Sequence, residues 1–375
     1  YFAAKKSKYK SGVMITGSHN PKNYNGFKMV MFNKSFYGKN IYNLGKFAEN
    51  GSDLIFTGEV ENINIEDEYI SRILKSFKNY EKGSLFDKKI IWDCGNGATG
   101  NILKNLIKYL PGKHFVLFSE IDGNFPNHDP DPTKEENLSE LKKNIIDLNA
   151  DFGIAFDGDG DRISVMKKDG ELIPGDILTS YLSLSINDKS KDIILDIKSS
   201  SVAKNIIEKL GFNVQIWKTG HSHIKSKMTE IGTLLAGEMS GHIFFSDEYY
   251  GYDDALYSSL RFLNLINEGH DLYSFLNDLD PYYATPELKI KCSEESKFQI
   301  IENISKKLKN KYKLNNLILI DGVRVNLNVG WYLIRASNTE NALVIRVEGK
   351  TEEYKKQLVQ EVKNLLYEEN IIVNL

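Results

Sequence analysis

The chain has 375 residues, of which 41% are hydrophobic and 26% are charged, as is typical of a globular protein with a sizeable core. This length predicts two to four domains. The formal net charge of −3 gives no reason to expect nucleic acid or an anionic membrane as partner, and no apolar run approaches the ~18 residues of a membrane helix. Cys94 and Cys292 lie far apart without a C-x-x-C context, which favours reduced thiols and a cytoplasmic location.

The first 63 residues predict only part of a folded domain. The lysine-rich start is expected to be a solvated strand edge or a fragment end, followed by strands at 12–16 and 27–32 and a helix over 38–49. A convincing amphipathic helix follows over 66–80, because Tyr69, Ile70 and Ile73 recur on one helical face.

Strands and helices alternate between residues 88 and 281. This alternation predicts βαβ units with a largely parallel sheet. The expected strands lie at 88–93, 115–118, 152–156, 163–166, 172–173, 193–197 and 214–217, and the expected helices at 101–109, 135–147, 176–186, 201–210 and 253–267. After Pro281 and Pro286 the pattern changes, and strands at 287–292, 323–327, 331–336 and 342–347 mix with helices at 297–309 and 351–367. We therefore expect a separate C-terminal α+β domain.

An acidic, glycine-rich loop, DGDGDR, follows the apolar run 152–156. Its carboxylates, Asp157, Asp159 and Asp161, stand two residues apart and would repel one another unless a cation lay between them. Oxygen ligands suit a hard ion, and Mg²⁺ is the usual one beside phosphates. An EF-hand is excluded, because the positions that need Gly and Glu hold Arg162 and Lys168. A solvated acidic turn is the simpler alternative.

The run TGSHNP at 16–21 also follows a strand. Ser18 could be an ordinary turn residue, and a catalytic triad is not indicated, since no nearby carboxylate would orient His19 as a base. A serine that carries a phosphoryl group beside a divalent cation fits better. Lys28, ten residues on, could contribute positive charge.

Three further loops carry polar groups suited to a sugar phosphate. The run KTGH at 218–221 follows an apolar strand. The Glu, Ser and His of GEMSGH at 237–242 offer donors and acceptors for sugar hydroxyls, although local hydrogen bonds could satisfy each of them. The run RASNT at 335–339 combines an arginine fork with hydroxyl, amide and backbone donors, which favours a phosphate site over a plain surface turn.

Together these motifs, in this order and across essentially the whole chain, resemble the α-D-phosphohexomutase superfamily. TGSHNP-KNYNGFKM and GEMSGH are similar to the bacterial phosphomannomutase/phosphoglucomutase branch. Phosphoglucosamine mutases usually read SASHNP and GEQSGH, so Gly17 and Met239 argue against that branch.

The resemblance implies a role for each motif. Ser18 would carry the phosphoryl group and, with Asp157, Asp159 and Asp161, bind Mg²⁺, while His19, Lys28 and Arg162 would surround it as catalytic groups. Substrate would be bound by the sugar-facing Lys198, His221, Glu238 and Ser240, and by the site for the non-reacting phosphate at Arg335, Ser337, Asn338 and Thr339.

The same resemblance implies an α/β fold of tandem domains with mixed sheets and a C-terminal α+β domain. The expected boundaries are a remnant of domain one at 1–63, domain two at 64–168, domain three at 169–281 and domain four at 282–375. The family has most of a domain before the serine loop, whereas 17 residues precede Ser18 here, so we expect domain one to be incomplete.

The implied activity interconverts hexose 1-phosphate and hexose 6-phosphate, of mannose or glucose, through phosphoserine and hexose 1,6-bisphosphate. We expect a cytoplasmic monomer that acts on a small sugar phosphate. The alternatives are a phosphoglucosamine mutase and a catalytically impaired fragment that binds sugar phosphates.

Overall fold

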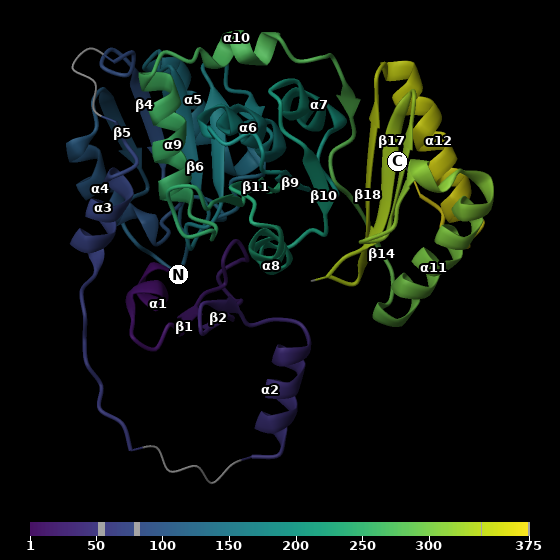
Figure 1. Cartoon of the computed structure of the whole chain (residues 1–375), viewed down its shortest axis with the longest axis horizontal. Coiled ribbons are helices and arrows are strands. Elements are labelled where there is room, and N and C mark those ends of the chain that lie inside the picture. The colour runs from purple at the N-terminus through teal and green to yellow at the C-terminus, as the bar shows by residue number, and fades with distance from the viewer. Residues whose placement is uncertain (52–56, 79–82, 339, 374–375) are drawn as a thin grey trace. The chain divides into compact units, whose positions relative to one another are not determined.

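The computed structural model describes residues 1–51, 57–78, 83–338 and 340–373 (Figure 1). Over these residues the chain forms two compact units. The first comprises residues 1–192 and 221–272, and the second comprises residues 193–220 and 273–375.

The centre of the first unit is a mixed sheet with the strand order β5-β4-β6-β7-β8. The pairs β5–β4 and β4–β6 are parallel, whereas β6–β7 and β7–β8 are antiparallel. The strands are β4 (Lys89–Asp93), β5 (Lys113–Leu117), β6 (Phe152–Phe156), β7 (Ile163–Lys167) and β8 (Leu172–Ile173). Every residue of β6 is buried, as expected of a central strand covered on both faces.

Helices cover both faces of this sheet. Side chains alternate along β6, so that Ala155 packs with Leu141 of α5 while the Phe152 ring lies 5.2 Å from the Phe262 ring of α9. The helices of this region are α3 (Glu66–Leu74), α4 (Thr99–Leu106) with η1 (Ile107–Tyr109), η2 (Glu135–Leu138) with α5 (Ser139–Asp147), and α9 (Ala255–Asn267). The acidic loop at 157–162, the predicted metal site, connects β6 to β7.

The remaining elements of the first unit carry the predicted sugar loop and the predicted His221. The hairpin of β11 (Leu235–Gly237) and β12 (Ile243–Phe245) carries the predicted sugar loop at its turn. The helices are α6 (Gly175–Leu182) with η3 (Ser183–Ser185), and α8 (His221–Ile231), which begins at the predicted His221.

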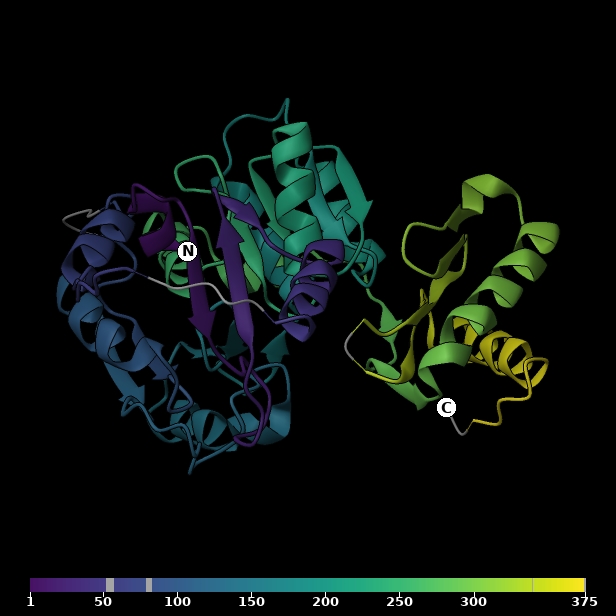
Figure 2. The same ribbon diagram turned by 90° about the horizontal axis from the view of Figure 1, so that it is seen from below.

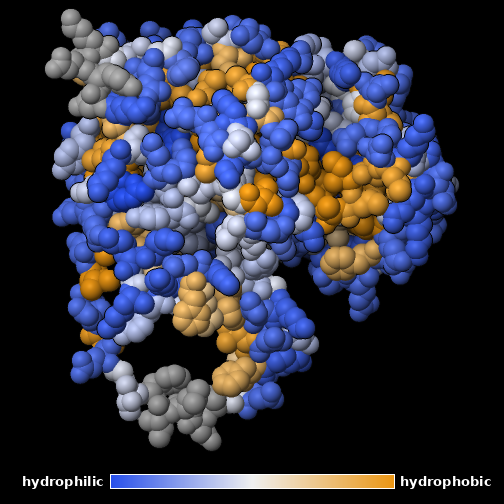
Figure 3. Space-filling view, in the orientation of Figure 1, coloured by the Kyte–Doolittle hydropathy of each residue, from blue (hydrophilic) through white to orange (hydrophobic). Residues whose placement is uncertain are grey.

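The N-terminal residues form α1 (Phe2–Lys6) and a small antiparallel sheet, β1-β2-β3, followed by α2 (Lys39–Glu49). The strands are β1 (Gly12–Ile15), β2 (Phe27–Met31) and β3 (Lys34–Ser35). Apolar side chains on this sheet and on α2 stay exposed, and part of this apolar surface is visible around α2 in Figure 3. Its members are Val13, Met14, Ile15, Phe27, Met31, Ile41, Leu44 and Phe47.

The second unit is built on an antiparallel sheet with the order β13-β18-β17-β16-β15, and β14 pairs with β18. Its strands are β13 (Tyr283–Ala284), β14 (Leu288–Lys291), β15 (Leu317–Ile318), β16 (Val323–Leu327), β17 (Gly330–Ala336) and β18 (Ala342–Gly349). The helices α11 (Glu294–Lys311) and α12 (Glu352–Tyr367) cover one face, as Figure 2 shows, and η4 (Leu314–Asn316) precedes β15.

The opposite face of this sheet packs on the segment 193–220. This segment contains the parallel pair of β9 (Ile193–Asp196) and β10 (Val214–Trp217) with α7 (Ser201–Lys209) between them. Ile197 forms a core with Trp331 and Leu333, and Arg324 donates to the carbonyls of Ile197 and Ser199. The helix α10 (Leu272–Asn277) precedes the C-terminal sheet.

Two local predictions are wrong. The lysine-rich start is not a strand edge but the helix α1, because Phe2 and Ala4 bury one face and the lysines lie near the helix C-terminus. The helix predicted over 66–80 ends at Leu74, since the chain turns and the amide of Lys78 donates to Asn264 in α9. Tyr80 lies outside the described residues.

The α/β class with mixed sheets and a C-terminal α+β part is confirmed, whereas the four domain boundaries stay predictions. None of the helices in the described part of the chain combines the length and apolarity needed to cross a membrane.

Candidate functional site

The serine loop and the acidic loop meet in the first unit. Ser18 Oγ lies 3.1 Å from Asp157 Oδ2 and 3.2 Å from Asp159 Oδ1, although more than 130 residues separate the two loops. Ser18 has a φ of +54°, a left-handed conformation that costs a residue other than glycine on the order of 1–2 kcal/mol. Strain of this kind often marks a functional turn.

A glycine allows the two loops to approach this closely. A Cβ atom at Gly158 would lie 2.3 Å from the carbonyl oxygen of Ser18, closer than real Cβ contacts allow. The residue between Asp157 and Asp159 must therefore lack a side chain for the serine to reach both carboxylates.

The carboxylates of Asp157, Asp159 and Asp161 offer oxygen atoms within 4.8 Å of one another. Their side chains are almost fully buried. Asp157 Oδ1 accepts the amides of Asp161 and Arg162, which fixes the turn. Burial, together with the charges of Asp161 and Asp159, raises the pKa of Asp157 well above its usual value.

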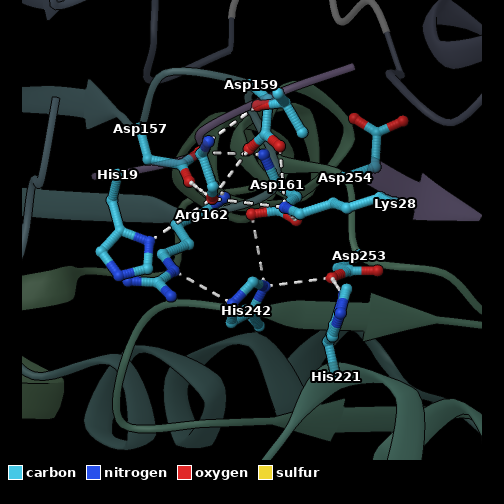
Figure 4. A network of polar contacts seen from close by, with 12 residues as sticks. His19, Lys28, Asp157, Asp159, Asp161, Arg162, His221, His242, Asp253 and Asp254 are labelled. Carbon is cyan, nitrogen blue, oxygen red and sulfur yellow. Dashed lines mark hydrogen bonds and ion pairs between the residues drawn. The ribbon is translucent and has the colours of Figure 1, made fainter. Parts of the chain in front are cut away.

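Lys28 supplies positive charge to this cluster. Its Nζ lies 2.7 Å from Asp159, 3.3 Å from Ser18 Oγ, and also pairs with Asp161 (Figure 4). Although burial opposes it, the charges of Asp161 and Asp159 raise the pKa of Lys28, so the side chain stays an ammonium. Lys28 can therefore stabilise negative charge near the serine.

His19 also contacts the serine, and Arg162 lies near His19. His19 Nδ1 lies 3.4 Å from Ser18 Oγ, and burial together with Arg162 lowers the pKa of His19 to about 4. The imidazole is therefore neutral near pH 7. Arg162 donates from Nε to Nε2 of His242 at 3.0 Å.

His242 connects the acidic loop to a second charged cluster. Because its Nε2 accepts from Arg162, its proton lies on Nδ1, which is 3.0 Å from Asp253 and 3.5 Å from Asp161. Burial lowers the pKa of His242, in keeping with a neutral ring. In Figure 4 the ring lies between Arg162 and Asp253.

Asp253 is the centre of that second cluster. Its side chain is fully buried and lies 3.0 Å from His221 and 2.8 Å from Lys225. Against the effect of burial, Lys225 and His221 hold the pKa of Asp253 well below its usual value. The predicted sugar-facing His221 is thus held by a carboxylate and an ammonium.

The sugar loop, 237–242, ends at His242, which contacts Asp253 of this cluster. Glu238 is buried, and its backbone closes the hairpin turn by donating to the carbonyl of His242 at 2.9 Å. Ser240 is half-buried at the tip of the same turn.

The remaining predicted site residues belong to the second unit. Lys198 is buried and pairs with Glu287 at 2.8 Å, and against the effect of burial this contact lowers the pKa of Glu287. Arg335, at the end of β17, contacts Asp321 with Nε at 3.0 Å and Nη2 at 3.3 Å. Ser337 is buried, Asn338 is exposed, and Thr339 lies outside the described residues.

The acidic loop fits a hard divalent cation. Asp159 Oδ2 lies 2.7 Å from the Lys28 ammonium, whereas Asp161 Oδ1 is a buried oxygen that accepts no hydrogen bond from the part of the chain that the structure describes. Buried carboxylate oxygens of this kind, with Ser18 at their edge, are suitable ligands for Mg²⁺.

Sequence reasoning missed Asp253, Lys225 and the contacts of His242. Asp253 and Lys225 belong to none of the recognised motifs, and their proximity depends on how α8 and the turn before α9 pack. The Asp253-Asp254 pair directly before an apolar helix was the available signal, but it reads equally well as a helix cap, which Asp254 does provide.

Comparisons with known proteins agree with this geometry. Profiles of the phosphoglucomutase/phosphomannomutase family match α/β/α domain I at residues 1–42, domain II at 67–170, domain III at 174–282 and the C-terminal domain at 287–365. The phosphomannomutase/phosphoglucomutase of Pseudomonas syringae pv. tomato is 41% identical over 359 residues, covering 94% of this chain and 75% of that protein.

The chain belongs to the phosphoglucomutase/phosphomannomutase family. A second relative, from Pseudomonas aeruginosa and of the same name, is 40% identical over 373 residues, which are 98% of this chain and 78% of that protein. A phosphoglucomutase of Neisseria meningitidis serogroup A is 39% identical over 358 residues, which are 94% of this chain and 76% of that protein.

A solved structure of a phosphoglucomutase/phosphomannomutase family protein from Burkholderia thailandensis superposes with a TM-score of 0.87 at 34% identity. The superposition covers 98% of this chain and 78% of the chain in that structure. Membership of this family confirms the predicted superfamily and the predicted class of enzyme, a phosphohexomutase.

Proposed function

We propose that the chain interconverts hexose 1-phosphate and hexose 6-phosphate, of mannose or glucose or both, through phosphorylated Ser18 and a hexose 1,6-bisphosphate. The position of Ser18 Oγ, 3.1 and 3.2 Å from two carboxylates and 3.3 Å from the Lys28 ammonium, carries this proposal. Phosphoryl transfer depends mainly on positioning and on neutralisation of charge, and this cluster supplies both.

In the proposed reaction the bond between phosphorus and Ser18 Oγ breaks while the oxygen of the free sugar hydroxyl forms a new bond to phosphorus, and the proton of that hydroxyl ends on Ser18 Oγ. The bisphosphate then presents its other phosphate to Ser18 Oγ. The bond between that phosphorus and its sugar oxygen breaks, Ser18 Oγ bonds to the phosphorus, and the serine proton ends on the sugar oxygen, which regenerates the phosphoserine. Lys28 stabilises the negative charge on the transferred group, and neutral His19 contributes a hydrogen bond at the serine.

The proposed cation is Mg²⁺, held by Asp157, Asp159, Asp161 and the phosphorylated Ser18. When bound, it would neutralise charge on the phosphoryl oxygens. Arg162 then keeps the acidic loop in register with the sugar loop through His242.

Substrate recognition is divided between two groups of residues in this proposal. His221, Lys198, Glu238 and Ser240 read the sugar hydroxyls, and Arg335, Ser337, Asn338 and Thr339 hold the phosphate that does not react. A cytoplasmic, monomeric enzyme stays our prediction.

Glucosamine phosphate is the alternative substrate, and a catalytically impaired sugar-phosphate-binding protein is the alternative function. The names of the relatives above support mannose and glucose more than glucosamine. A coupled assay with mannose, glucose and glucosamine 1-phosphates distinguishes the three possibilities.

The central experiment is an intact-mass measurement before and after phosphatase treatment. We expect a loss of one phosphate that Ser18→Ala abolishes, together with mutase activity, whereas Ser190→Ala at an exposed serine should change neither. A phosphate that persists in Ser18→Ala would contradict the proposal.

A further inference from the structure

The turn between β15 and β16 contains a carboxylate, Asp321, beside the arginine of the RASNT loop. Both carboxylate oxygens contact the Arg335 guanidinium, from Nε at 3.0 Å and from Nη2 at 3.3 Å. The two side chains are largely buried, with exposed fractions of 5% for Arg335 and 14% for Asp321. The contact is therefore a partly desolvated, two-point ion pair rather than a surface salt bridge.

The backbone of this turn is built against Arg335. Gly322, which follows Asp321, has a φ of +77°. A Cβ atom there would lie 2.4 Å from the Ile334 carbonyl oxygen and 2.5 Å from Arg335 Cβ. Only glycine fits this position, and its close approach holds the Asp321 carboxylate beside the guanidinium.

The same carboxylate also holds a second loop of this unit. Asp321 Oδ2 accepts the amide of Thr219 at 3.2 Å, and Thr219 Oγ1 donates to Asp196 at 2.9 Å. The turn that follows β10 is thus attached to the turn that precedes β16. These contacts use residues of the second unit alone.

We propose that Asp321 is a positioning residue that orients Arg335 for binding a sugar-bound phosphate. A guanidinium has a side-on donor edge, made by Nε and Nη2, and an end-on edge, made by Nη1 and Nη2. Asp321 occupies the side-on edge, so the end-on edge remains for the two oxygens of a phosphate. The inference rests on the proposed function, in which Arg335 binds the non-reacting phosphate.

The orientation has an energetic reason. A free arginine side chain loses rotamer entropy when it is fixed. Because Asp321 and the turn at Gly322 fix Arg335 before substrate arrives, binding does not incur this loss.

The opposite interpretation is that Asp321 competes with phosphate for the guanidinium. That interpretation predicts tighter phosphate binding when Asp321 loses its charge.

The test is calorimetric binding of glucose 1-phosphate to the full chain carrying Ser18→Ala, which prevents turnover. We expect Asp321→Asn to raise Kd roughly tenfold, on the order of one lost charge-assisted contact. In the protein that keeps Ser18 and turns over, Asp321→Asn should raise KM by a similar factor while kcat changes little. Added to Arg335→Ala, Asp321→Asn should have no further effect, and Asp188→Asn at an exposed carboxylate is the control.

Three outcomes separate the possibilities. Tighter binding by Asp321→Asn would overturn the inference in favour of competition. An unchanged Kd in Asp321→Asn, with weaker binding in Arg335→Ala, would overturn the inference and leave the proposed function intact. Unchanged binding in Arg335→Ala would remove the proposed phosphate site itself.

A second variant guards against misfolding. Asp321→Glu keeps the charge but displaces it by one methylene. If this variant folds and raises Kd by less than Asp321→Asn does, the result supports a positioning role for Asp321. If its melting temperature and its Kd both equal those of the parent protein, the result counts against that role.

Discussion

The Lys28 ammonium lies 2.7 Å from the Asp159 carboxylate and so connects the serine loop to the acidic loop. The same ammonium lies 3.3 Å from Ser18 Oγ. One cation therefore faces both the proposed phosphoryl carrier and the proposed metal ligands.

Replacement of Lys28 by Met should lower kcat by about 10²-fold, the usual cost of removing one donor that stabilises developing charge. The coupled mutase assay measures this loss. The control is Lys22→Met, an exposed lysine between the serine loop and β2, which should keep its activity. Equal activity of the two variants would show that Lys28 takes no part in the transfer.

Asp159→Asn should lower turnover on the order of 10³-fold, because the proposed cation loses a charged ligand. In metal-free protein the melting temperature should stay unchanged or rise, since repulsion among buried carboxylates is relieved. Turnover is measured against Mg²⁺ concentration, with exposed Asp169→Asn as the control. Unchanged turnover at limiting Mg²⁺ would exclude this loop as the metal site.

Asp253→Asn should destabilise the first unit by about 3 kcal/mol, because it leaves the buried Lys225 ammonium without its carboxylate. Differential scanning calorimetry measures this change in the free energy of unfolding. Adding Lys225→Met should recover part of the lost stability, since the uncompensated charge is removed. Additive losses in the double variant would mean that the two side chains do not stabilise each other.

The imidazole of His114 gives a pH dependence of stability. Trp92 Nε1 donates to His114 Nδ1 at 3.0 Å, so the ring must be neutral to accept, and burial lowers the pKa of His114. This lowered pKa adds stability that is present above the unfolded pKa of about 6.5 and is lost as pH falls through the folded pKa.

The melting temperature should therefore fall more between pH 7.5 and 5.5 in the parent protein than in His114→Gln, which does not titrate. The variant His270→Gln, at an exposed histidine, should follow the parent. The same decrease in all three proteins would show that His114 does not contribute to the pH dependence.

Much of the chemistry was predictable because it is encoded in short runs. The spacing of Asp157, Asp159 and Asp161 indicates a cation site wherever the loop is placed, and alternating apolar periods predicted most strands and helices. Helix ends were less predictable: the helix after residue 66 stops at Leu74 because Asn264, far along the chain, captures the amide of Lys78.

The sequence alone therefore determined which groups are available: a serine and three carboxylates, each in a loop after a strand, and an arginine fork at the end of a strand. Only the tertiary structure decided which of them meet. Ser18 reaches Asp157 across 139 positions because glycine at 158 lets two backbones touch, and Arg335 turns toward Asp321 because Gly322 packs on its backbone. Residue type and the period of apolar residues are properties of a short segment, whereas contacts between distant segments depend on the packing of whole sheets and helices.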